Sequence, residues 1–179
     1  KTMPFSGRLI GDFSLNVTNH LTADYLLSKG LSSVCASYDL NQTQLFDLAA
    51  QCDSAKLEVT MHQYMPSFHM EHCVFAAFLS KGSSFRDCGK PCEKHRVELI
   101  DQFENRHQIK PDHECRNTMY NAVSQSAARL YPELQKLGLR FVRLEALNER
   151  KDELISKIRG YQDLLAGRAS VEEIVQKLS

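Results

Sequence analysis

The feature that most constrains the fold is a junction that occurs twice in the chain. Residues 26–37 read LLSKGLSSVCAS and residues 134–145 read LQKLGLRFVRLE, and both pass from a helical pattern through Gly and Leu into an apolar strand. Glycine ends helices readily because it adopts the left-handed conformation without steric strain. The repeat of this junction therefore predicts a chain built from successive helix–strand units.

Strand and helix patterns alternate on both sides of these junctions. Such alternation is typical of a mainly parallel sheet with helices packed on its outside. The predicted fold class is α/β with parallel βα units, either about half of a TIM-like (β/α)8 barrel or a small doubly wound sheet. We expect strands at Leu9–Val17, Leu31–Ser37, Lys56–His62 and Arg140–Leu144, helices at Leu21–Lys29, Asn41–Cys52 and Ser126–Leu137, and an extended segment at Arg96–Asp101.

The C-terminal segment differs from the rest of the chain. Residues 148–179 read as two helices, and the second begins with a capping box in which Ser170 is followed three positions later by Glu173. We therefore expect residues 1–147 to form the barrel part that carries the cysteine site. Residues 148–179 would form a helical tail.

The charge balance and the cysteine count restrict the class of protein. The 179 residues carry 22 Lys and Arg against 22 Asp and Glu, so bulk charge gives no reason to expect nucleic-acid or membrane-surface binding. No apolar run approaches the ~20 residues of a membrane span, and the N-terminus has no signal-peptide pattern. Six cysteines without an export signal predict a reducing, cytoplasmic location. Because the chain starts at Lys1, we expect a fragment of a longer protein.

Three cysteines and two histidines fall within residues 69–92, HMEHCVFAAFLSKGSSFRDCGKPC. Cys88 and Cys92 lie in DCGKPC, where Gly89 and Pro91 favour a tight turn that lets both sulfurs face one point. Convergent thiolates of this kind suit a tetrahedral zinc ion or an iron–sulfur cluster.

Two further cysteines are candidates for the same site. Cys73 follows the third predicted strand, and Cys115 ends another strand-like segment, so in a parallel sheet both would emerge at the carboxyl edge. We expect their sulfurs to converge with those of the Cys88–Cys92 pair. Free or buried cysteines and a disulfide are the alternatives. Cys35 and Cys52 are in phase with apolar neighbours, and we expect both to be buried and outside any site.

The two histidines of this segment are substitute ligands. His69 and His72 are three residues apart on a segment that we read as a helix, a spacing that also suits zinc. Either one would replace Cys115 if that cysteine lay away from the others. A half-exposed polar face is the alternative reading of the pair. His72 also precedes Cys73 directly, but adjacent residues seldom form a nucleophile–base pair.

Part of the chain resembles a known family. LEVTMHQYMPSFHMEHCVFA, followed by DCGKPC, resembles the characteristic pattern of peptidase family U32, the collagenase-like proteases. Glu58 and His62 match the Glu and His of that pattern, and Cys73 falls on its second cysteine. Cys88 and Cys92 fall on its last cysteine pair. GDFSLNVTN, at residues 11–19, is similar to an earlier strand of the same family.

The chain departs from the family pattern at several positions. Thr60 stands where the pattern has Phe, Gln63 and Glu71 where it has Gly, and Pro66 where it has its first cysteine. Cys115 is then the natural fourth ligand, because some family members take a ligand from farther along the chain. The resemblance implies a (β/α)8-type barrel, of which this chain would be the C-terminal half or so.

The resemblance implies more than one activity. Some members resemble iron–sulfur proteins of oxygen-independent hydroxylation, which would place a 4Fe–4S cluster on Cys73, Cys88, Cys92 and Cys115. Others are peptidases of unassigned catalytic type, for which Glu58 and His62, on one face of the third strand, are the catalytic candidates. A structural zinc site on the same cysteines is the third hypothesis. The substrate would be a peptide, RNA or a quinone-like molecule, and the partner would be the remaining half of the barrel or another subunit.

Overall fold

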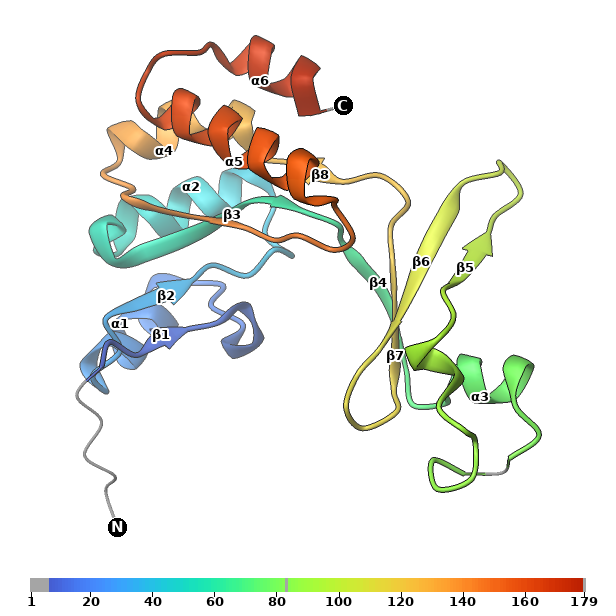
Figure 1. Cartoon of the computed structure of the whole chain (residues 1–179). Coiled ribbons are helices and arrows are strands. Elements are labelled where there is room, and N and C mark those ends of the chain that lie inside the picture. The colour runs from blue at the N-terminus through green and yellow to red at the C-terminus, as the bar shows by residue number, and fades with distance from the viewer. Residues whose placement is uncertain (1–6, 83, 179) are drawn as a thin grey trace. The chain divides into compact units, whose positions relative to one another are not determined.

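The computed structural model describes residues 7–82 and 84–178, and these divide into two compact units. The parallel unit comprises the described residues up to Gln63 and from Ser126 onward. The inserted unit comprises Tyr64–Gln125 (Figure 1). No helix in the described part of the chain is long and apolar enough to cross a membrane.

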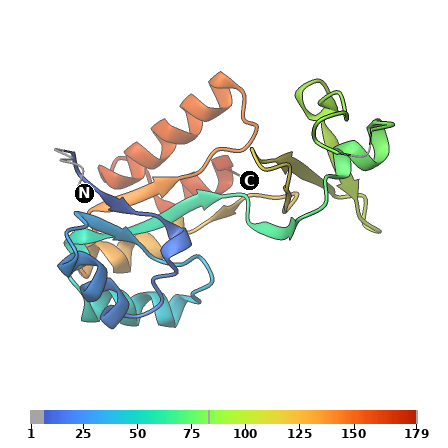
Figure 2. The ribbon, with the colours of Figure 1, turned by 90° about the horizontal axis from the view of Figure 1, so that it is seen from below.

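The parallel unit is built around a sheet whose four main strands run in one direction and lie in chain order (Figure 2). Each main strand is followed by a helix of the same unit, which confirms the predicted α/β class with parallel βα units. A short fifth strand, β8 (Gln125–Ser126), joins the sheet beside the third. The main elements are β1 (Ile10–Gly11), α1 (His20–Ser28), β2 (Ser33–Cys35), α2 (Gln42–Gln51), β3 (Leu57–Gln63), α4 (Tyr131–Lys136), β9 (Phe141–Leu144) and α5 (Lys151–Leu165).

The two similar junctions of the sequence adopt similar backbone conformations. Gly30 follows α1 and Gly138 follows α4, and each has a φ of 98°. Residues with side chains are strained in this left-handed region, so both glycines end their helices at little cost. The chain then enters β2 and β9 respectively, as the repeat predicts.

The first predicted strand, Leu9–Val17, is longer than the strand that forms. Only Ile10–Gly11 pairs as β1, because the Asp12 side chain accepts a hydrogen bond from the next backbone N–H at 2.7 Å. This bond begins a 3-10 helix at Phe13–Leu15. Val17 returns to the sheet through a single bridge to Ala36.

The predicted helix at Ser126–Leu137 is also shorter than expected. Its first residues form the end of β8 and a 3-10 helix at Ala128–Leu130, and α4 begins only at Tyr131. Pro132 lies in the first turn of α4, where its missing N–H and fixed φ are tolerated. The Ala127 N–H donates to the Met61 carbonyl of β3 at 2.9 Å and the Ser126 hydroxyl bonds the Tyr161 hydroxyl at 2.8 Å, so these residues are held by the sheet and by α5 instead of by a helix.

One face of the parallel sheet carries the hydrophobic core of its unit. Alternate residues of β3 point into it, because successive side chains of a strand face opposite sides. The core combines these residues with apolar side chains from the helices. It includes Val34, Leu57, Val59, Met61, Ala23, Leu45, Leu48, Leu134, Tyr161, Leu164 and Ile174.

On the opposite face of the sheet, side chains just before and just after the first strand meet side chains of the last strand. The Arg143 guanidinium of β9 lies 2.5 Å from a Glu58 carboxylate oxygen and 2.6 Å from an Asp12 carboxylate oxygen. Arg8 lies over the ring of Phe141 at 5.6 Å from its centroid. Because β2 and β3 lie between β1 and β9 in the sheet, these contacts require the sheet to curve toward this face.

The C-terminal helices pack into the parallel unit. Tyr161 and Leu164 of α5 and Ile174 of α6 (Val171–Leu178) are buried in its core. The predicted capping box is present, since Ser170 Oγ accepts from the Glu173 N–H at 3.2 Å and the Glu173 carboxylate accepts from the Ser170 N–H at 2.7 Å. The tail therefore covers the core of this unit.

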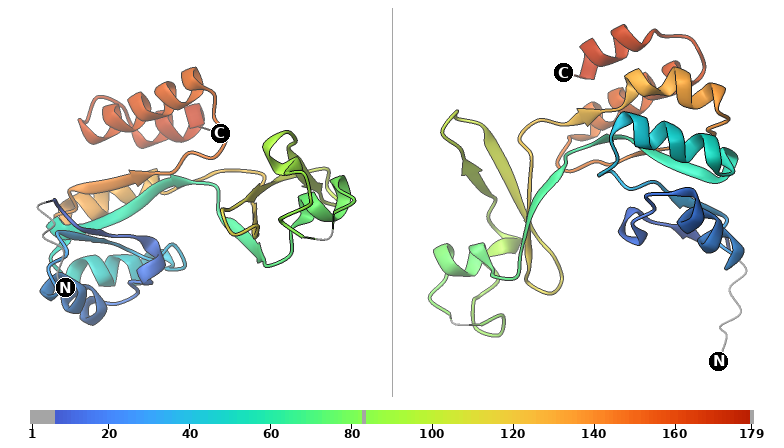
Figure 3. Two further views of the ribbon diagram at one scale, coloured as in Figure 1. Left: turned by 60° about the horizontal axis from the view of Figure 1, so that its bottom comes forward. Right: turned by 180° about the vertical axis from the view of Figure 1, so that it is seen from behind.

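The inserted unit has a different architecture, which alternation in the sequence did not predict. Its four strands are antiparallel in the order β4-β7-β6-β5 (Figure 3). The expectation that Cys73 and Cys115 emerge from the edge of a parallel sheet is therefore wrong. The elements are β4 (Pro66–Met70), α3 (Val74–Leu79), a 3-10 helix at Pro91–Glu93, β5 (Val97–Ile100), β6 (Arg106–Pro111) and β7 (Asn117–Tyr120).

The inserted unit has a small core of its own. Phe75 of α3, Ile109 of β6 and Met119 of β7 are its buried apolar side chains. Cys73 and Cys92 are among the half-buried residues that pack against it. The core thus holds α3 and the Pro91–Glu93 turn against one sheet, and with them the cysteines that these segments carry.

Candidate cysteine centre

The start of α3 positions Cys73. This residue is the N-cap of the helix, and its sulfur accepts a weak hydrogen bond from the Ala76 N–H at 3.5 Å. Asn117, fully buried on β7, accepts from the Val74 N–H at 2.7 Å and places its amide nitrogen 4.0 Å from the Cys73 sulfur. Cys73 is therefore held by its own helix and by the sheet.

A compact turn positions Cys88 and Cys92. Gly89 and Lys90 both have left-handed backbone conformations, with φ of 67° and 50°, and Pro91 then begins the 3-10 helix that contains Cys92. The two left-handed residues reverse the chain within a few positions. The turn that Gly89 and Pro91 predict is thus present.

The loop before Cys88 is closed by local hydrogen bonds. The Asp87 carboxylate accepts from the backbone N–H of Ser84 at 2.7 Å and from its hydroxyl at 3.0 Å. Gly82 approaches this loop so closely that a Cβ atom there would lie 2.4 Å from the Asp87 carbonyl oxygen. This close approach explains why position 82 is a glycine.

Cys115 lies in the hairpin turn between β6 and β7. It has a left-handed φ of 64°, and its N–H donates to the Asp112 carbonyl at 3.3 Å. The Asp112 carboxylate accepts from the N–H groups of Glu114 and Arg116 at 2.8 Å and 2.9 Å, and it pairs with the Arg116 guanidinium at 2.8 Å. Asp112 thereby organises the turn that carries the cysteine.

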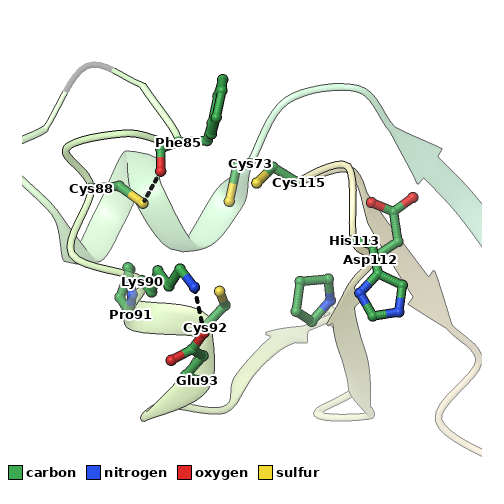
Figure 4. A pocket seen from close by; sticks show the side chains of 11 residues that line it. Cys73, Phe85, Cys88, Lys90, Pro91, Cys92, Glu93, Asp112, His113 and Cys115 are labelled. Atoms are coloured by element: carbon green, nitrogen blue, oxygen red, sulfur yellow. Dashed lines mark hydrogen bonds and ion pairs between the residues drawn. The ribbon is translucent and has the colours of Figure 1, made fainter.

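All four of these cysteines line one cavity of about 470 Å³, which we call the cysteine cavity. Figure 4 shows their sulfurs turned toward the space between α3 and the Pro91–Glu93 turn. None of the four forms a disulfide. Within residues 7–82 and 84–178, however, no group of three or more His, Cys, Asp and Glu side chains is gathered tightly enough to hold a metal ion. The cavity therefore brings the four thiols together without closing them on one ion.

The electrostatics of the cavity reflect the proximity of these thiols. Partial desolvation raises the pKa of the Cys115 thiol above its ordinary value, and repulsion from the thiolates of Cys73, Cys88 and Cys92 raises it further. Lys90 lies on the same cavity, and its pKa is raised mainly by Glu93, whose carboxylate is 3.1 Å away, and also by Cys92 and Cys88. A nearby cation such as Lys90 stabilises a set of neighbouring thiolates because it offsets their negative charge.

The donor set fits a soft metal centre. Thiolates are ligands of iron–sulfur clusters and of zinc, and four half-exposed thiols are accessible to both. His113 also lines the cysteine cavity, although the sequence analysis did not select it. Its signal in the sequence was its place two residues before Cys115 in the turn HEC.

The two substitute ligands lie on a strand and its exit rather than on one helix. His69 is in β4 and its Nδ1 lies 3.0 Å from the Thr118 hydroxyl of β7. His72 follows β4 and lines a second cavity beside the cysteine cavity. The expected helical spacing of these histidines is therefore wrong, because the Pro66–Met70 segment pairs with β7.

The other two cysteines lie in the parallel unit. Cys35 is fully buried in β2, as predicted, whereas Cys52 at the end of α2 is only half-buried. Burial raises the pKa of both thiols to about 11. At neutral pH these thiols are therefore protonated and poor nucleophiles.

The proposed peptidase pair, Glu58 and His62, belongs to two separate networks of the parallel unit. Glu58 pairs with Arg143. The register of β3 against β9 shifts between Thr60 and His62, so that His62 lies beside Leu144, which packs against the core. The alternation that predicts one face for Glu58 and His62 is thus interrupted by this irregularity.

His62 is almost fully buried and lies between α5 and the segment after β9. Its Nε2 is 3.1 Å from the Lys157 ammonium and 3.6 Å from a Glu149 carboxylate oxygen, and its Nδ1 is 3.5 Å from the Tyr161 hydroxyl. Burial and the nearby Lys157 charge lower the pKa of His62. The lysine pairs with Glu149 at 2.9 Å, and hydrogen bonds help to lower the pKa of that carboxyl to about 2.

Comparison with known proteins gives one match. No curated protein and no solved structure matches the chain. The model of Peptidase family U32 matches residues 7–177, which is nearly the whole chain and spans both units. The chain therefore belongs to peptidase family U32.

Proposed function

We propose that the inserted unit binds a 4Fe–4S cluster through Cys73, Cys88, Cys92 and Cys115. The observation that carries this proposal is that all four thiols line the cysteine cavity. The resemblance of the sequence pattern supports it as well, because three of the four cysteines fall on cysteines of the family pattern. Thiolates are the ligands that such clusters require.

Three residues at or near the cavity would help the cysteines to hold the cluster. Asn117 would orient Cys73, and Asp112 would fix the turn of Cys115. Lys90 would offset part of the negative charge that thiolates bring to the site. When bound, the cluster would supply one-electron transfer, and the proposed use is oxygen-independent hydroxylation or related redox chemistry on a substrate.

Two alternatives to the cluster proposal are tested alongside it. Zinc is the alternative ion for the cysteines, because it accepts four thiolates. Peptidase activity would require Glu58 or His62 to act as a general base. Glu58 accepts a hydrogen bond from Arg143, and His62 Nε2 lies 3.1 Å from the Lys157 ammonium, so the atoms that would take up a proton already face a donor.

We also propose that the parallel unit is part of a (β/α)8 barrel completed by further βα units, supplied by the same protein or by a partner subunit. Two observations support this. The four main strands lie in chain order, which is the order within a barrel wall. Contacts of Arg143 with Asp12 and of Arg8 with Phe141 require a curved sheet.

The test is the composition and colour of anaerobically purified protein. We expect iron and acid-labile sulfide with a broad absorption shoulder at the blue end of the visible range. Cys88→Ser and Cys115→Ser should lose iron and colour, whereas Cys52→Ser should keep both. Zinc without iron would instead assign the cysteines to a zinc site, and full iron content in Cys88→Ser would overturn the four-cysteine assignment.

A peptide-cleavage assay addresses the peptidase alternative. We expect the wild-type protein and Glu58→Gln to be equally inactive toward collagen-like and unstructured peptides. Cleavage by the wild type that Glu58→Gln abolishes would favour the peptidase. Inactivity of both with iron present would favour the redox function.

A further inference from the structure

A second cavity lies beside the cysteine cavity and shares a wall with it. This neighbouring cavity has a volume of about 520 Å³, within the range of small-molecule sites. Cys73, Phe85, Cys88 and Cys115 line both cavities. A molecule in the neighbouring cavity would therefore touch three of the four proposed ligands.

The shared wall includes an aromatic side chain with a large exposed area. Phe85 is 67% exposed, although it belongs to a loop closed by several hydrogen bonds. The Arg86 guanidinium lies 5.5 Å from the centroid of this ring. Figure 4 shows the ring among the side chains that line the cysteine cavity. Exposed rings at a cavity wall are favourable surfaces for stacking another planar ring.

The charges around the neighbouring cavity nearly balance, and the Arg86 guanidinium over Phe85 belongs to this balance. Its charged lining residues, within the described part of the chain, are Glu71, Glu114 and Lys81. The Glu114 carboxylate is already paired with Arg116 at 2.6 Å. The thiolates in the shared wall add further negative charge once ligated. A phosphate or carboxylate gains no net attraction from this lining, whereas an uncharged group with N–H or O–H donors finds carboxylate acceptors in Glu71 and Glu114.

We infer that the neighbouring cavity binds a neutral planar ring of the substrate, stacked on Phe85 and donating hydrogen bonds to the carboxylates of the cavity. The inference rests on the proposed redox function, because it places that ring next to the cluster ligands. Phe85 would act as a positioning residue. It would align the ring with the cysteine site and would take no part in ligating the cluster.

The test uses three small probes with matched chemistry. Benzamide is a neutral planar ring with N–H donors, cyclohexanecarboxamide keeps the donors but lacks the aromatic ring, and benzoate keeps the ring but is an anion. Ligand-observed saturation-transfer NMR on the anaerobically purified protein gives the affinity of each. We expect benzamide to bind about tenfold more tightly than either of the other two.

Three variants at two phenylalanine positions distinguish the shared wall of the cavities from an exposed phenylalanine elsewhere in the inserted unit. Phe85→Leu should weaken benzamide binding about tenfold, whereas Phe85→Tyr should retain it. Phe78→Ala is the matched control, because Phe78 is 81% exposed on α3 of the same unit and lines neither cavity. Equal binding of benzamide and cyclohexanecarboxamide, or wild-type affinity in Phe85→Leu, would overturn the inference.

Iron and sulfide analysis of the same samples separates this inference from the proposed function. Normal iron content with lost benzamide binding in Phe85→Leu supports the stacking site. Normal iron content with unchanged binding overturns the stacking site alone. Absence of iron from the wild-type protein overturns the proposed function on which the inference rests.

Discussion

Asn117 on β7 bonds the first turn of α3 and lies against the sulfur of Cys73, so one buried amide links the sheet of the inserted unit to a proposed ligand. The distance from Asn117 Oδ1 to the Val74 nitrogen is 2.7 Å. Few amide side chains are fully buried, since such a group must satisfy its hydrogen bonds inside the protein.

Replacing this amide should loosen the cysteine centre. Asn117→Ala leaves the Val74 N–H without its partner, and we expect a loss of about 1–3 kcal/mol in the free energy of unfolding. Iron content should fall in parallel, because Cys73 would lose its fixed position. Urea unfolding and iron analysis measure the two effects. Asn121→Ala, which removes only an exposed contact with Ser67, is the control and should change neither.

The face of the parallel sheet opposite its core depends on Arg143. Arg143→Met leaves the Glu58 carboxylate, whose side chain is 14% exposed, without its counter-ion. We expect the free energy of unfolding to fall by about 2 kcal/mol, because a partly buried charge is left unpaired. Arg140→Met removes an exposed charge just before the same strand and should have little effect. Equal destabilisation by both variants would argue against the ion-pair network.

Stability of the parallel unit should depend on pH through His62. Its folded pKa lies below the ordinary value of 6.5, so the unfolded chain binds protons more readily. The contribution of the neutral histidine is therefore present above about pH 6.5 and is lost as pH falls through the folded pKa. Glu149, with a pKa of about 2 against 4.5, adds a second loss only at lower pH.

Unfolding by urea at pH 7.5 and pH 5.5, on the order of one unit either side of the ordinary histidine pKa, measures the effect. His62→Gln should show a smaller difference between the two pH values than the wild type. His95→Gln, at an exposed site of the inserted unit, should match the wild type. A wild-type difference that persists unchanged in His62→Gln would assign the pH dependence to other groups.

A methyl group at position 82 should disturb the loop that carries Cys88. Gly82→Ala would place a Cβ atom 2.4 Å from the Asp87 carbonyl oxygen, so the backbone of one segment must move. We expect faster limited proteolysis between Ser84 and Cys88 and reduced iron content. Gly160→Ala in α5 meets only Ile174, at 3.5 Å, and should leave both properties unchanged.

Local signals predicted part of this structure well. The two junction glycines, Gly30 and Gly138, and the turn at Gly89 and Pro91 depend on backbone preferences of a few adjacent residues, and these act in any context. The strand at Leu57–Gln63 followed from its length and its apolar residues. Such features can be predicted because the residues at the position itself determine them.

Features that depend on distant partners were not accessible from one sequence. Arg143 and Glu58 are 85 positions apart, so nothing in either segment identifies the other as its partner. The strand at Pro66–Met70 carries Pro, Ser and His on largely exposed positions, and it forms only because β7 pairs with it. Because this strand pairs with β7 in an antiparallel sheet, the four cysteines lie in the inserted unit and not in the parallel one. The four cysteines line one cavity, since their turns are local even though the surrounding sheet is not, and their role as ligands stays a prediction.

The inserted unit begins and ends at neighbouring points of the parallel sheet. The Ala127 N–H, just after the unit, donates to the Met61 carbonyl, just before it, at 2.9 Å. The inserted unit leaves and re-enters the parallel sheet at neighbouring positions, so the strands of that sheet pair with one another without it. The cysteine-bearing segment is thus an insertion that the parallel sheet does not need for its own strand pairing. A short linker between Gln63 and Ser126 is therefore expected to replace the whole insertion while the host strands keep their order.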